Sequence, residues 1–199
     1  ELLERGYEPE TIWGTSVGSL NGGFLADRVG AREPAAPDWP AAGRALERFW
    51  IEEVTSFRRL GRKRRLPELA WAIATGRFDG LLDMSPLVRL VRSTLSAERM
   101  ARSRVGFHAC AVDIASGEAV YADKADPRIL DYIVASTAIP LVMPVAMVGA
   151  TPLWDGGIRE VAPLRKAIVD AKATEIVCVA CDPTRPGGAR RTGSRSSRP

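Results

Sequence analysis

A serine in the pattern G-x-S-x-G is the first feature of the sequence that could do chemistry. Ser16 lies two residues after Gly14 and two before Gly18. A serine hydroxyl attacks an acyl carbon only if it protrudes from the backbone, which a sharp strand-to-helix turn achieves at the cost of local strain. We expect the two glycines to give this turn room. The pattern predicts a nucleophile elbow at Ser16; the alternative is a glycine-rich turn that binds a phosphate or nothing.

The base that would activate Ser16 is restricted by composition, because the chain contains one histidine. His108 lies between Phe107 and Ala109 in an alternating run, a setting more typical of a packed or hydrogen-bonded ring. Asp155 is the stronger candidate, since it ends an apolar stretch and precedes two glycines. We expect desolvation to raise the pKa of its carboxyl and to make it a competent base. The alternative is that Asp155 only forms an Asp-Gly turn.

The backbone that follows the serine provides a candidate oxyanion donor. A helix beginning at Val17 would direct its first N–H groups toward the developing oxyanion, with the Val17 N–H as the first donor. A metal mechanism is disfavoured, because the lone histidine and the scattered acids make no ligand set. We therefore expect neither a metal nor another cofactor.

Strands that alternate with helices along the chain would position these residues. We expect strands at residues 10–13, 104–114, 118–122 and 175–180, an extended segment at 144–148, and helices at 19–28, 41–53, 67–75, 85–91, 127–137 and 163–171. This alternation is typical of an α/β sandwich with a mostly parallel sheet. A length of 199 residues favours one domain.

Two of the three cysteines form a C-x-x-C pair in the last of these expected strands. Cys178 and Cys181 lie in a run rich in β-branched residues, whereas a redox pair requires a helix N-terminus. Positions i and i+3 of a strand face opposite sides. We therefore expect both residues to be core thiols rather than a redox or metal site.

A long stretch without charge could be mistaken for a membrane span. Residues 132–154 contain no charged side chain, but Pro140, Pro144 and Pro152 divide the stretch into pieces too short to cross a bilayer. We expect this stretch to be buried core.

Basic charge is concentrated in two segments of the chain. Residues 183–199 hold five arginines and no acid, so the rest of the chain is close to neutral, and we expect this tail to be disordered. Six of the eight residues at 58–65 are cationic: Arg58, Arg59, Arg62, Lys63, Arg64 and Arg65. This cationic segment is interpreted as a solvated face or as a contact with anionic membranes. Nucleic-acid binding is disfavoured, because no aromatic residue is interleaved.

Three motifs in order resemble the patatin-like phospholipase family. They are GTSVGSLNG at 14–22, ASTAIP at 135–140 and WDGGI at 154–158. The resemblance covers most of residues 1–182 and implies a three-layer α/β/α sandwich with a mostly parallel central sheet. It also implies a lipid acyl hydrolase with Ser16 as nucleophile and Asp155 as base, in a dyad without histidine. Gly156 and Gly157 complete the Asp-Gly-Gly motif, and residues 33–102 would be a helical, lid-like insertion that covers the site.

One part of the family pattern is not in this sequence. Family members carry a glycine-rich oxyanion loop after a first strand, and residues 1–6 resemble the end of the helix that follows it. We therefore expect a domain over 1–182 that lacks this strand and loop, and little activity from the chain by itself.

The predicted function is cleavage of fatty-acyl ester bonds in lipids by a cytoplasmic or peripherally membrane-bound enzyme. The expected partner is a lipid or another acyl-ester substrate. The alternative is a catalytically incompetent module that binds lipid or a partner and keeps the elbow at Ser16 as a structural turn.

Overall fold

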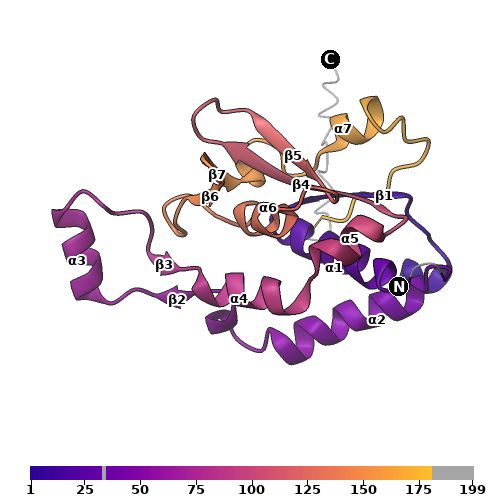
Figure 1. Cartoon of the computed structure of the whole chain (residues 1–199), viewed down its shortest axis with the longest axis horizontal. Coiled ribbons are helices and arrows are strands. Elements are labelled where there is room, and N and C mark those ends of the chain that lie inside the picture. Colours follow the sequence, from indigo (N-terminus) through magenta and orange to yellow (C-terminus); the bar gives the residue numbers. More distant parts are fainter. Residues whose placement is uncertain (33–34, 181–199) are drawn as a thin grey trace, which may run out of the picture.

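A mixed sheet forms the centre of the protein in a computed structural model that describes residues 1–32 and 35–180 (Figure 1). Its strands in these residues are β1 (Thr11–Thr15), β4 (Gly106–Asp113), β5 (Ala119–Asp123), β6 (Ala146–Val148) and β7 (Thr151–Asp155). β1 pairs in parallel with β4, whereas the β4–β5, β4–β7 and β6–β7 pairs are antiparallel. The prediction of an α/β fold is confirmed. The sheet is mixed rather than mostly parallel, because short turns join β4 to β5 and β6 to β7.

The register of β4 brings the ends of two strands together. Thr15 at the end of β1 lies opposite Cys110, and Asp155 at the end of β7 lies opposite Ala111. β5 pairs with residues 108–112 and so occupies the other edge of β4. β1 and β7 therefore share one edge of β4 and meet at their carboxyl ends.

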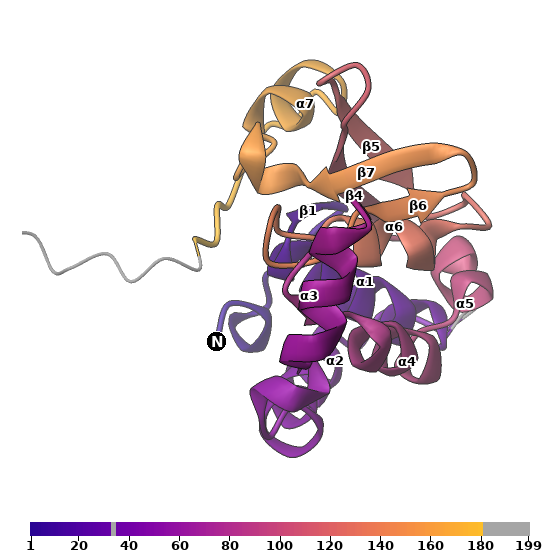
Figure 2. The same cartoon turned by 90° about the vertical axis from the view of Figure 1, so that its left-hand side faces the viewer.

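Helices cover both faces of this sheet. α1 (Val17–Gly30) and α6 (Ile129–Ala135) pack on one face, and α7 (Leu164–Val169) lies on the other (Figures 1 and 2). α7 contacts the sheet through Lys166, whose ammonium lies 5.1 Å from the ring centroid of Tyr121 on β5. This arrangement agrees with the predicted three-layer sandwich.

The segment predicted as an insertion contributes to the central core. It contains α2 (Trp39–Arg48), the helical turn Phe49–Glu53, α4 (Ser85–Thr94) and α5 (Ala97–Arg102). α2 begins at Trp39 because the carboxylate of Asp38 accepts a hydrogen bond from the Ala41 N–H at 3.0 Å. Side chains from this segment share one hydrophobic cluster with α1 and β4: Phe49, Leu87, Val91 and Met100 pack with Phe24 and Phe107. These helices therefore share one core with the sheet.

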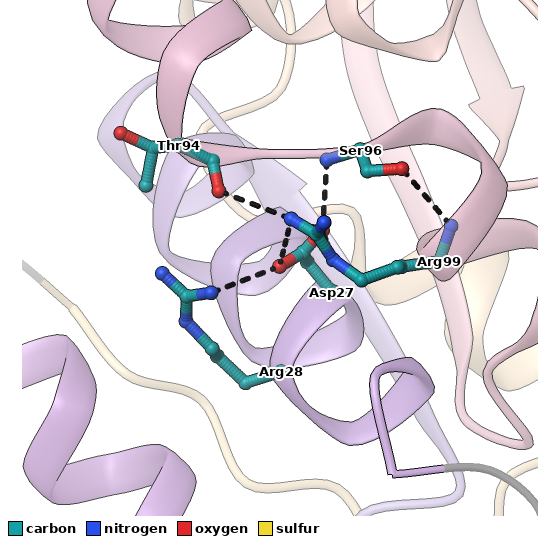
Figure 3. A network of polar contacts seen from close by, with 5 residues as sticks. All are labelled: Asp27, Arg28, Thr94, Ser96 and Arg99. Atoms are coloured by element: carbon teal, nitrogen blue, oxygen red, sulfur yellow. Dashed lines mark hydrogen bonds and ion pairs between the residues drawn. The ribbon is translucent and has the colours of Figure 1, made fainter.

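A buried acid fastens the end of α1 to α5 (Figure 3). Asp27 is fully buried, and its two carboxylate oxygens accept hydrogen bonds from Arg99 at 3.0 and 3.1 Å. The Ser96 N–H donates to the same carboxylate at 2.8 Å, and Arg28 lies 3.5 Å away. A charge at this depth is tolerated because it is paired and hydrogen-bonded on several sides.

One part of the segment stands away from the body. The finger, residues 62–83, consists of the short antiparallel strands β2 (Arg62–Lys63) and β3 (Leu82–Asp83) with α3 (Leu66–Ala74) between them. Figure 1 shows α3 at the far end of this projection, on the side of the molecule where β1 passes into α1.

Two predictions about apolar stretches require correction. Residues 175–180 form no strand and are exposed, Cys178 included, because no described strand supplies the hydrogen bonds that a strand requires. Cys181 and the predicted tail, 183–199, lie outside the described residues. Residues 132–154 are core only in part: residues 133–136, 138, 143, 148 and 153 are buried, whereas Ile139, Leu141 and Met147 are exposed. Within the described residues, no helix is long and apolar enough to cross a membrane.

Candidate active site

The turn from β1 into α1 has the strained geometry expected of a nucleophile elbow. Ser16 has φ 56° and ψ −127°, a conformation that non-glycine residues adopt rarely. A Cβ on Gly14 would lie 2.4 Å from the Gly18 carbonyl oxygen, so no side chain fits there. A Cβ on Gly18 would meet nothing within 4 Å. The predicted need for room therefore holds at Gly14 and not at Gly18, which borders open space.

A buried hydroxyl at the C-terminal end of α6 holds the elbow. Ser136 is fully buried, and its Oγ accepts a hydrogen bond from the Ser16 N–H at 2.9 Å. The same hydroxyl donates to the Cys110 carbonyl on β4. The Ser19 hydroxyl lies 2.8 Å from Ser136 Oγ and 2.7 Å from the Gly14 carbonyl oxygen. Ser136 thus links α6, β4 and the elbow in one hydrogen-bonded group.

Ser16 and Asp155 are in direct contact. The Ser16 hydroxyl donates a hydrogen bond to Asp155 Oδ2 at 2.6 Å, and the Gly157 N–H donates to Oδ1 at 2.7 Å. The Asp155 N–H donates to the Ala138 carbonyl at 2.9 Å, which fixes the end of β7 against the segment after α6. A Cβ on Gly156 would lie 2.5 Å from the Cys110 carbonyl oxygen, so this backbone also approaches too closely for a side chain.

The surroundings of Asp155 favour a basic carboxylate. Only 5% of the residue is exposed, and burial raises the pKa of its carboxyl above the ordinary value for aspartate. The hydrogen bonds from Ser16 and Gly157 oppose this rise in the pKa without cancelling it. In the described part of the chain, no basic side chain forms an ion pair with Asp155. The carboxylate therefore has a higher proton affinity than an exposed aspartate, directed at one hydroxyl.

The start of α1 offers backbone donors beside the nucleophile. The first N–H groups of an α-helix have no intrahelical acceptor. The Ser19 N–H donates to the Ser16 carbonyl at 2.9 Å, whereas Val17 and Gly18 precede that bond and are partly exposed. These two N–H groups, together with the positive end of a 14-residue helix, are suited to an oxyanion on a substrate bound at Ser16.

His108 has other contacts. Its ring stacks on Trp13 with a centroid distance of 3.9 Å, and its Nδ1 lies 3.7 Å from the carboxylate of Asp123. Burial lowers the pKa of this imidazole, so it is neutral at pH 7. These contacts agree with the prediction of a packed ring.

Neither a reactive thiol nor a cluster of metal ligands accompanies Ser16 and Asp155 in the described residues. The thiol of Cys110 is buried, and burial raises its pKa to about 11, so it does not form a reactive thiolate at neutral pH. Among residues 1–32 and 35–180, the histidine, cysteine and acidic side chains form no group of three that could hold a metal ion.

Three residues that support the contact between Ser16 and Asp155 were not predicted from sequence. Ser19, Ser136 and Ala138 lie in the motifs from which the family resemblance was drawn, yet none received a role. Small polar residues inside a mostly apolar run, Ser136 and Thr137, were the available signal. The three neighbours of Ser136 across the sheet could not be inferred from spacing along the chain.

Comparison with known proteins agrees with this geometry. The sequence model of one family, Patatin, described as patatin-like phospholipase, matches residues 1–168. The match includes both Ser16 and Asp155. The chain matches none of the curated proteins.

Proposed function

We propose that this chain, which belongs to the patatin-like phospholipase family, cleaves fatty-acyl ester bonds of lipids through a dyad of Ser16 and Asp155. Family membership supports a lipid acyl hydrolase in general terms. The observation that carries the finer proposal is the 2.6 Å hydrogen bond from a strained, partly exposed serine to a buried carboxylate. A serine in this state has both the exposure and the proton acceptor that nucleophilic attack requires.

In the proposed acylation step, Ser16 Oγ attacks the carbonyl carbon of the ester as its proton passes to Asp155 Oδ2. The tetrahedral intermediate places its negative oxygen near the N–H groups of Val17 and Gly18. The C–O bond to the alcohol then breaks, and the leaving oxygen takes the proton from Asp155. The products of this step are the free alcohol and an acyl group on Ser16.

Deacylation repeats these events with water. Asp155 accepts a proton from a water molecule, which attacks the acyl carbon, and the bond to Ser16 Oγ breaks. The proton returns to Ser16 Oγ, and the fatty acid leaves. The proposed steps require no metal or organic cofactor, because the carboxylate handles each proton in turn.

The alternative is a module that binds lipid or a partner and uses the elbow as a structural turn. The strain at Ser16 favours the enzyme, because a turn without a chemical role gains nothing from a non-glycine residue at positive φ.

The test is the release of fatty acid from mixed micelles of phospholipid or of diacylglycerol. We expect slow release of fatty acid by the wild-type chain, in keeping with its missing oxyanion loop, and no release above background by Ser16→Ala and Asp155→Asn. Ser85→Ala, which removes an exposed hydroxyl on α4, is the matched control and should act as wild type. Equal release by wild type and Ser16→Ala would favour the binding module.

The proposed setting is the cytoplasm, with peripheral contact to anionic membranes. The proposed membrane contact is the cationic segment: Arg58, Arg59, Arg62, Lys63, Arg64 and Arg65. Two of these side chains are engaged within the finger, since Arg62 pairs with Asp83 at 3.2 Å and Arg64 pairs with Asp79 at 2.5 Å. The lipid is the proposed partner, and no nucleic-acid partner is proposed.

A further inference from the structure

The finger carries apolar side chains that are largely exposed, although Arg77 lies 5.8 Å from the ring centroid of Trp71. Leu66, Trp71 and Ile73 on α3 are 81%, 59% and 64% exposed, and Ala72 is the one residue of this helix that is buried. A single charged residue, Glu68, occurs among the nine residues of α3. A helix that is apolar on most sides is normally buried in a core or in lipid.

The exposed apolar surface continues toward the dyad. The Leu81 and Leu82 N–H groups at the base of the finger donate to the carbonyls of Leu141 and Val142, at 3.3 and 2.9 Å. Leu141 is 72% exposed, and three residues before it Ala138 accepts the hydrogen bond from the Asp155 N–H. One short loop, residues 138–142, therefore joins the backbone of Asp155 to the base of the finger.

A cationic cavity lies where the finger leaves the body. It has a volume of about 990 Å³, and five basic side chains contribute to its lining: Arg58, Arg59, Arg62, Lys63 and Arg89. Glu53 is the acidic side chain of this lining. Within the described residues, all of these basic groups except Arg62 lack a hydrogen bond or an ion pair. Such a cavity suits a phosphate group, which several guanidinium groups can share.

We propose that the finger is a membrane-docking element that inserts α3 into the interface of an anionic bilayer. Leu66, Trp71 and Ile73 enter the boundary between headgroups and acyl chains, while the cationic cavity receives the phosphate of an anionic phospholipid. At 1.5 Å per residue α3 is about 14 Å long, which suits a helix that lies in the interface rather than one that spans it. The charge balance selects this occupant, because residues 57–83 contain seven basic and three acidic side chains. Docking would hold the loop at 138–142, and with it the dyad, against the substrate surface.

The choice of a lipid partner rests on the proposed function, but its test needs no turnover. The test measures co-sedimentation of the full chain carrying Ser16→Ala with lipid vesicles. The vesicles consist of phosphatidylcholine, with or without about 30 mol% phosphatidylserine. We expect strong binding to the anionic vesicles and weak binding to the neutral ones. Failure of catalysis would leave this result unchanged, so the two proposals fail separately.

The apolar contribution is tested by the pair Trp71→Ser and Ile73→Ser. Loss of two inserted apolar side chains should weaken binding to anionic vesicles by on the order of a hundred-fold. The matched control is Val161→Ser with Val169→Ser, which removes two apolar side chains that are 80% and 60% exposed elsewhere. The control should bind as the parent does. In a separate measurement, brominated lipid should quench tryptophan fluorescence of the parent, and Trp71→Phe should abolish this quenching.

The cavity is tested by the charge reversals Arg58→Glu and Arg59→Glu. Each basic group near an anionic surface strengthens binding about five-fold, and reversing its charge costs more than removing it. Reversal of both groups should therefore weaken binding by roughly a hundred-fold. The control reverses Arg159 and Arg165, two exposed groups on the side of α7, and should change binding little. Circular dichroism confirms that each variant is folded.

Several outcomes would overturn the proposal. One is equal binding by a test pair, Trp71 with Ile73 or Arg58 with Arg59, and its control pair. Another is equal binding to neutral and anionic vesicles. A third is self-association in sedimentation velocity that the Trp71 and Ile73 substitutions abolish, without any vesicle binding. That result would identify a second copy of the chain as the cover of α3.

Discussion

Ser136→Ala is predicted to loosen the elbow without touching either member of the dyad. The substitution removes a fully buried hydroxyl that accepts from the Ser16 N–H and donates to the Cys110 carbonyl. Each of these two backbone groups would lose its partner, at a cost of about 1–3 kcal/mol per buried group. Partial rehydration through the exposed side of Ser16 would lower the sum, so we expect a loss of roughly 2–4 kcal/mol.

For a domain of this size, that loss corresponds to a fall in melting temperature of roughly 4–16 °C. Chemical denaturation followed by tryptophan fluorescence measures the free energy directly. The matched control is Thr137→Ala, because among the described residues the Thr137 hydroxyl bonds only to the Val134 carbonyl of its own helical turn, at 2.7 Å. We expect that variant to lose less than about 1 kcal/mol.

The same variant should slow the reaction of Ser16 with a fluorophosphonate. Misplacement of a reacting group by about 1 Å can cost on the order of a hundred-fold in rate, so a ten- to hundred-fold decrease is expected. The rate for Thr137→Ala should match wild type. If Ser136→Ala were as stable and as reactive as Thr137→Ala, the role assigned to Ser136 would be wrong.

Three further predictions concern the elbow, the buried ion pair and the pH dependence of the site. Gly14→Ala should unfold or strongly destabilise the protein, because the new Cβ would lie 2.4 Å from a backbone oxygen. Gly18→Ala should fold normally, because a Cβ at Gly18 meets nothing within 4 Å. Thermal melts of the two variants check this contrast. Asp27→Ala should lower the free energy of unfolding by about 3–5 kcal/mol, because it leaves the partly buried Arg99 guanidinium without its acidic partner. Urea denaturation measures this loss. A loss below about 1 kcal/mol, the value of a surface ion pair, would contradict the prediction. The labelling rate of Ser16 should fall as the pH drops through the raised pKa of Asp155, because only the carboxylate accepts the proton, and Asp155→Asn should be slow at every pH. The folded protein holds this proton more tightly than the unfolded chain does. The free energy of unfolding should therefore decrease as the pH rises from the ordinary pKa of aspartate through the raised pKa of Asp155. Asp155→Asn should remove this dependence of stability on pH.

Ser16 and Asp155, which the structure places in contact, could be selected from sequence because the proposed chemistry restricts residue type and local context. One histidine in an alternating strand left a carboxylate as the base, and the glycines after Asp155 marked the turn where it lies. Contact between Ser16 and Asp155 depends instead on two strands sharing one edge of β4, a register that local patterns do not encode. The support from Ser136 was missed for the same reason, since its partners are 26 and 120 residues away.

The errors at residues 175–180 and in the loop before β6 have a common cause. Composition measures the tendency of a segment to be buried, but burial also requires a surface to pack against. Val179 and Leu141 have no such surface in the described structure and are exposed. Exposed apolar residues therefore indicated the finger and its neighbouring loop as an interaction surface only when the tertiary structure was known.

Covalent labelling of Ser16 tests the proposed dyad most directly. The protein is treated with a fluorophosphonate, and the adduct is located by intact mass and peptide mapping. The proposed mechanism predicts one adduct, on Ser16, that is absent from Ser16→Ala and strongly reduced in Asp155→Asn. An unmodified Ser16 in folded wild-type protein, or equal labelling of wild type and Asp155→Asn, would contradict a Ser-Asp dyad.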